Sequence, residues 1–168
     1  MNRDYKNFLS VLGAALFLIF LASFQVSFIN SSFLGLNLFL ILILYLVLTK
    51  NDSKALIFAW LGGILLSLNY FSNFGISSLI LLILTAILIV LYKTIFLTLK
   101  TESILLASII GVALYHFLNW LLTSGEFRFY FAVREILTEL ILTALILLII
   151  FKIKTPQAVR QQRGRQNA

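Results

Sequence analysis

The amino-acid sequence predicts an all-α, polytopic membrane protein with six transmembrane helices joined by short loops. The 168 residues are 61% hydrophobic and only 11% charged, with a mean hydropathy of +1.06. So few charges do not cover the surface of a water-soluble domain of this length. The apolar residues also gather in long runs between short polar segments, and a single proline permits long uninterrupted helices.

Six apolar runs approach the length needed to cross a hydrocarbon core of about 30 Å. They cover residues 8–29, 33–48, 55–71, 76–99, 104–122 and 127–151. The runs are apolar on all sides, whereas barrel strands alternate, and a segment in lipid has to satisfy its own backbone, so helices are expected. We predict one transmembrane domain at residues 1–155. A basic cytoplasmic tail without regular structure is predicted at residues 156–168, beginning where Pro156 ends the last helix.

Lysine and arginine are distributed unequally between the two predicted sides of the membrane. Eleven lie on the side of the N-terminus, namely Arg3, Lys6, Lys50, Lys54, Lys93, Lys100, Lys152, Lys154, Arg160, Arg163 and Arg165. Only Arg128 and Arg134 lie on the other side. Because the loops are short, the positive-inside rule applies and predicts that the N- and C-termini are cytoplasmic. The basic tail is expected to contact anionic lipid rather than nucleic acid.

No signature of catalysis or metal binding is present in the sequence. Cysteine is absent, and His116 is the only histidine. The chain has no Walker loop, zinc-protease motif, nucleotide fingerprint or nucleophile elbow. The sequence therefore predicts no enzyme, no cofactor and no metal site, and His116 is expected to form a hydrogen bond between helices.

Two carboxylates fall within the sixth apolar run. Glu135, Glu139 and Thr143 share one helix face, and Glu139 falls near mid-membrane by rise per residue. A charge there costs about 2.5–3.5 kcal/mol on insertion scales, so the carboxylates should face the bundle or the outer interface. Two interpretations remain open. One is a proton, substrate or partner site, and the other is a structural carboxylate paired with His116 or Arg134.

The stretch from residue 59 to 79, AWLGGILLSLNYFSNFGISSL, concentrates small and polar residues. They include Gly62, Gly63, Ser67, Asn69, Asn73 and Gly75. The glycine pair permits close helix approach, and the serine can bond the carbonyl four residues earlier. The asparagines can cap helix ends, and the last glycine suits a tight turn. This pattern predicts a rigid hairpin on the outer side, between the third and fourth spans.

The same region resembles the rod shape-determining MreD family. Asn37 opens LFLILILYLVL, the loop TKNDSK follows, and then come GILLSL from Gly63, the turn NYFSN and the Phe74-Gly75 pair. The resemblance is sharpest over residues 34–99 and covers the rest only as a hydropathy profile. Leu36 stands where the family usually has proline, and Ser67 where it often has aspartate.

The resemblance implies a non-enzymatic membrane scaffold of the cell-elongation complex, in the bacterial plasma membrane. Such a scaffold would bind a single-span MreC-type partner and, through it, the glycosyltransferase and transpeptidase that build side-wall peptidoglycan. Asn37, Glu135, Glu139 and the six hairpin residues are the candidate contact or structural residues. The implied architecture is similar to the S-component-like membrane fold.

The alternative is the substrate-binding membrane subunit of an energy-coupling-factor transporter. Such subunits usually carry a small-xxx-small motif on the first helix. Here Ala14 is followed four residues later by Leu18, and Ala15 by Ile19, so the motif is missing.

Overall fold

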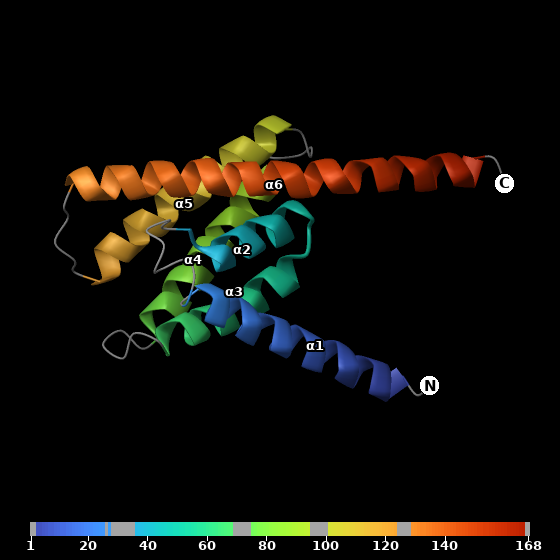
Figure 1. The fold of residues 1–168 in the computed structure, drawn as a ribbon, viewed down its shortest axis with the longest axis horizontal. Coiled ribbons are helices and arrows are strands. Elements are labelled where there is room, and N and C mark those ends of the chain that lie inside the picture. Colours follow the sequence, from blue (N-terminus) through green and yellow to red (C-terminus); the bar gives the residue numbers. More distant parts are fainter. Residues whose placement is uncertain are drawn as a thin grey trace.

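The computed structural model describes residues 3–25, 27, 36–68, 75–94, 101–123 and 129–166, with side chains at 12–25, 27, 36–68, 75–94, 101–122 and 133–153. Every regular element in these ranges is a helix, which confirms the all-α class there (Figure 1). The helices are α1 (Arg3–Phe24), α2 (Leu38–Leu48), α3 (Asp52–Ser67), α4 (Ile76–Thr94), α5 (Thr101–Thr123) and α6 (Phe129–Gln166).

Three of these helices are long and apolar enough to cross a membrane. The segments are Ile76–Thr94, Thr101–Leu122 and Val133–Ile153. The apolar parts described for α1 and α2 are shorter, and α3 has 16 residues. A membrane protein is therefore indicated, while the prediction of six spans is not confirmed for α1, α2 and α3.

The helix ends sort to two ends of the molecule. The N-terminal end of α1 and the C-terminal end of α6 both lie toward the right of Figure 1, α1 below and α6 above. The C-terminal end of α3 and the N-terminal ends of α4 and α6 lie toward the left. An ion pair of 2.7 Å between Lys93 Nζ and Asp52 Oδ2 joins the last turn of α4 to the first turn of α3. The described ends of the first and last helices thus point to the same side of the molecule.

The core of the described fold is α2. This helix is apolar on every face, and a helix of that kind is stable only when it is surrounded. Eight of its 11 residues are buried, and Phe39, Leu40, Ile43 and Leu44 have no exposed surface. Neighbours that cover it come from α3, α4, α5 and α6. At about 16 Å, α2 is roughly half as long as a membrane-spanning helix.

The C-terminus of α2 forms a Schellman motif. The backbone N–H of Asn51 donates to Leu46 O at 2.9 Å, and that of Lys50 donates to Val47 O at 3.0 Å. Lys50 adopts the left-handed conformation (φ 60°) that this motif usually assigns to glycine. The turn lets α3 begin at Asp52, so the connection is shorter than the predicted loop TKNDSK.

The α3–α4 pair is held by the small residues that the sequence pointed to. A Cβ on Gly63 would meet the Ser78 backbone, including its nitrogen at 2.6 Å, and a Cβ on Gly62 would meet the ring of Phe39. Ser78 Oγ also donates across the two helices to Trp60 O at 3.0 Å. Close helix approach is therefore confirmed at Gly63, whereas Gly62 makes room for a side chain of α2.

Two further expectations for this pair hold. Ser67 is fully buried and its hydroxyl donates to Gly63 O, four residues earlier, at 2.8 Å. Gly75 has φ +88°, which a residue with a side chain rarely adopts. The predicted capping residues Asn69 and Asn73 lie outside the described residues.

The sequence predicted that the last helix ends at Pro156, and this prediction is wrong. The backbone stays helical from Phe129 to Gln166, so residues 156–166 are not an irregular tail. A proline removes one N–H donor and crowds one carbonyl, but the hydrogen bonds before and after it remain available. In this 38-residue helix the local loss does not stop the chain from continuing.

The close approach at Gly63 predicts that Gly63→Ala destabilises the α3–α4 pair. The added methyl group would press on backbone rather than on a flexible side chain, at a cost of about 1–3 kcal/mol. Thermal unfolding of the purified protein in detergent measures the loss. Gly13→Ala is the matched control, since nothing lies within 4 Å of its Cβ. It should gain roughly 0.5–1 kcal/mol of helix stability, and equal effects of the two variants would contradict the contact.

Candidate functional site

A fully buried carboxylate, that of Glu139 on α6, is bound at both of its oxygens. Oε1 accepts the backbone N–H of Asn37 at 3.2 Å. Oε2 lies 2.6 Å from His116 Nε2 on α5. The carboxylate therefore joins α5, α6 and the residue that precedes α2.

The two side chains come from neighbouring helices. His116 lies on α5 and Glu139 on α6, and these two helices pack against each other. The imidazole of one helix and the carboxylate of the other meet between them.

The N-terminus of α2 lies beside the same carboxylate. Asn37 is its N-cap, and its side-chain Oδ1 accepts the backbone N–H groups of Phe39 at 3.1 Å and Leu40 at 3.2 Å. An uncapped helix start would leave several donors without a partner inside the protein. The sequence prediction that Asn37 opens this helix is confirmed.

Gln25, immediately after α1, completes the cap. Its Oε1 accepts the backbone N–H of Leu38 at 2.8 Å, and its Nε2 donates to Leu36 O at 2.6 Å. The amide thus bonds the chain on both sides of Asn37. Together with Glu139 and Asn37 itself, it satisfies all of the backbone N–H groups from residue 37 to residue 40.

The electrostatics of this polar cluster (Gln25, Asn37, His116 and Glu139) are favourable. A negative carboxylate at the start of a helix interacts with the positive end of the helix dipole. A nitrogen and an oxygen 2.6 Å apart need a proton between them, so His116 and Glu139 share at least one proton. Chemically, the cluster can hold a proton while it fastens helices together.

The predicted site residues separate into two groups. Asn37 and Glu139 meet in the polar cluster, whereas Gly62, Gly63 and Ser67 are buried in helix packing. Glu135, four residues before Glu139, is exposed. Of the two interpretations left open for Glu139, the contacts match the structural carboxylate paired with His116. Across the described ranges, no group of three metal-ligating side chains comes together.

The part of this site that sequence reasoning missed is the role of Gln25. A glutamine near the end of an apolar helix could have been recognised as a residue in need of partners. Its sequence position does not say that those partners are backbone groups around Asn37.

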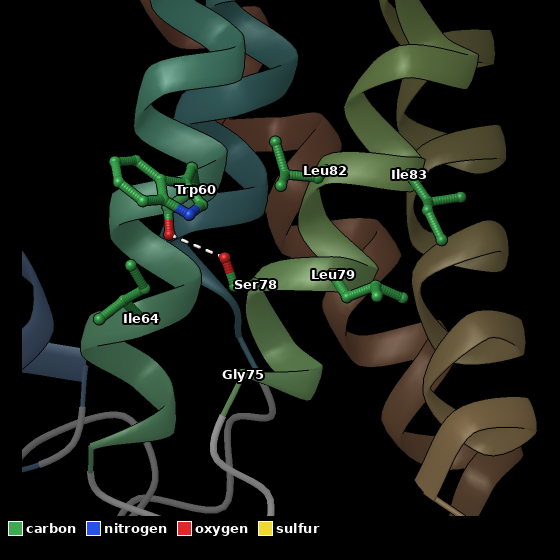
Figure 2. A pocket seen from close by; sticks show the side chains of 7 residues that line it. All are labelled: Trp60, Ile64, Gly75, Ser78, Leu79, Leu82 and Ile83. Atoms are coloured by element: carbon green, nitrogen blue, oxygen red, sulfur yellow. Dashed lines mark hydrogen bonds between the residues drawn. The ribbon is translucent and has the colours of Figure 1, made fainter.

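A second feature is an open groove between α3 and α4, with a volume of about 470 Å³. Figure 2 shows its lining residues, which are Trp60, Ile64, Gly75, Ser78, Leu79, Leu82 and Ile83. The Trp60 side chain is 52% exposed, and no described residue accepts its indole N–H. The groove is apolar apart from this donor and the Ser78 hydroxyl, which already bonds the Trp60 carbonyl.

No protein-family model, curated protein or solved structure matches this chain. Its function is therefore inferred from its own residues and contacts.

Because both carboxylate oxygens of Glu139 have a partner, we predict that Glu139→Ala is strongly destabilising. The variant leaves His116 and the Asn37 N–H without their partner inside the protein, which costs about 3–5 kcal/mol when a buried charge pair is broken. Glu139→Gln should lose much less, because an amide retains an acceptor for Asn37 and a polar contact for His116. Thermal unfolding in detergent ranks the variants. The exposed Glu135→Gln serves as the control, and a loss there as large as that of Glu139→Ala would contradict this role.

For Thr143 we predict a substitution that does not destabilise the protein, in contrast to Glu139→Ala. Thr143 is fully buried one turn after Glu139, and its Oγ1 has no hydrogen-bond partner among the described residues. Thr143→Val keeps the shape and removes the unsatisfied group, so stability should stay level or rise by about 1 kcal/mol. The same unfolding assay measures it, with Ser108→Ala as the contrast, since the Ser108 hydroxyl bonds Ile104 O at 2.8 Å. A clear loss in Thr143→Val would mean that the hydroxyl does have a partner.

Proposed function

We propose that this protein is a non-catalytic scaffold of the cell-elongation complex in the bacterial plasma membrane, with six spans and cytoplasmic termini. Its task would be to hold a single-span partner of the MreC type. The observation that carries the proposal is the α3–α4 pair, which combines a tightly packed interior with an open apolar groove. A fixed surface of this kind suits a binding partner better than a reaction.

The interior of the protein supports a structural role. Several polar side chains inside the bundle bond one another or the backbone, as Glu139 does with His116 and Asn37. Ser67, Thr85 and Ser108 each donate to a carbonyl four residues earlier. Groups that are satisfied in this way stabilise a fixed arrangement, and they are not available to bind a substrate.

The groove has features that fit a membrane helix. Its floor is formed by the small residues Gly75 and Ser78, and small residues let helix backbones approach closely. Its wall carries the indole of Trp60, whose N–H has no acceptor among the described residues and favours a partner helix with a hydroxyl or amide acceptor at that level. The groove lies on the hairpin that resembles the MreD family pattern, from Gly63 to Gly75.

The wider role follows from that resemblance. Through the partner, the scaffold would support the glycosyltransferase and transpeptidase of side-wall peptidoglycan synthesis. Lipid would cover the remaining apolar surface, which includes Phe20, Val90 and Leu137.

The test is to fill the groove. Leu79→Trp and Ile83→Trp place large side chains over its floor and should reduce co-purification with the MreC-type protein of the same organism by about tenfold, equivalent to about 1.4 kcal/mol. They should also fail to restore rod shape in depleted cells. Val90→Trp is the control on the same helix, since Val90 is 60% exposed and does not line the groove.

Two results would contradict the proposal. One is undiminished co-purification of both groove variants at normal expression. The other is a vitamin retained through purification and lost in Glu139→Gln, which would favour the transporter subunit.

A further inference from the structure

We propose that the part of α6 beyond its apolar segment, residues 154–166, is a docking site for an acidic surface of a soluble protein. This segment is called the α6 extension below. The proposal is independent of the MreC-type partner and requires only that α6 crosses the membrane.

The α6 extension continues the helix well past the apolar segment. The apolar segment ends at Ile153, and the helical backbone ends at Gln166, 13 residues later. At the rise of an α-helix this is about 20 Å. In Figure 1 the C-terminal part of α6 projects at the right, beyond α2, α3 and α4.

The charge on this segment has a single sign. Arg160, Arg163 and Arg165 lie in the extension, Lys152 and Lys154 lie at its base, and no acidic residue occurs from position 152 to the end of the chain. Of the acidic residues on the same predicted side of the membrane, Asp52 is paired with Lys93, and Asp4 and Glu102 lie on α1 and α5. The segment therefore carries positive charge without a counter-charge of its own.

Distance along the helix shows which arginines can reach lipid headgroups and which are placed for a protein partner. The headgroup layer adds about 5–7 Å beyond the hydrocarbon core on each side. Lys154 falls in that layer, whereas Arg163 and Arg165 fall about 15–18 Å beyond Ile153 along the helix. The attraction of anionic lipids falls off over about 8 Å at physiological salt. The outer arginines are thus placed for a partner in solution.

Residue type and spacing indicate the chemistry of that partner. Arg160 and Arg163 are three positions apart, so they occupy neighbouring places on one helix face. Guanidinium groups bind carboxylates through two parallel hydrogen bonds, which a lysine cannot do. An Asp- or Glu-rich helix or loop is the complementary surface.

The test uses the full-length protein in nanodiscs, made either of phosphatidylcholine alone or with added phosphatidylglycerol. The probe is a fluorescent, glutamate-rich soluble peptide. The wild-type protein should bind it in both lipids, and the triple variant Arg160→Gln, Arg163→Gln and Arg165→Gln should bind about tenfold more weakly. The control is Lys50→Gln, Lys54→Gln and Lys100→Gln, which removes the same charge elsewhere and should stay within about twofold.

A second measurement places the extension relative to the lipid. Because the chain has no cysteine, Gln157→Cys and Gln166→Cys each give one labelling site. Headgroup-bound quencher should affect a fluorophore at position 157 and leave one at position 166 unaffected in both lipids.

Three outcomes would overturn the proposal. Quenching at position 166 in anionic nanodiscs would mean that the extension lies on the membrane. Equal losses in the two triple variants would mean that net charge alone drives binding. Tighter binding of a single-stranded RNA of equal charge than of the peptide would assign the site to nucleic acid.

Discussion

The carboxylate of Glu139 is the constraint on which the arrangement of the central helices depends. A buried charge is tolerated only when its partners are fixed, and here one partner is a side chain on α5 while the other is a backbone group at the start of α2. Gln25 adds α1 to the same point. Four helices are therefore linked at one point by polar contacts, in addition to the apolar packing around α2.

The features that were predictable from the sequence are those that local chemistry decides. Helix type follows from the long apolar runs, and the start of α2 follows from the preference of asparagine for a cap. The Ser67 back-bond lies within one helical turn. The path of α6 past Pro156 was not predictable in this way, because a proline lowers helix stability locally while the length of a helix depends on the whole segment.

The candidate site was predictable only in part, for a geometric reason. His116 was one of the two partners considered for Glu139, and Arg134 was the other. The second contact of Glu139, to the Asn37 backbone, joins residues 102 positions apart and depends on how deeply α2 sits in the bundle. The same is true of the glycine contacts, since close approach was expected at Gly62 but the Phe39 ring opposite was not.

The central position of α2 has a consequence for the order of assembly. The ribosome makes α2 before all four of the helices that cover it, so the helix that is innermost at the end is among the first to leave the ribosome. Until α6 has been made, the carboxylate beside Asn37 does not exist, and the backbone N–H of this N-cap residue lacks its acceptor. The last helix therefore completes the folding of the second, and a chain shortened before Glu139 would leave its own centre open.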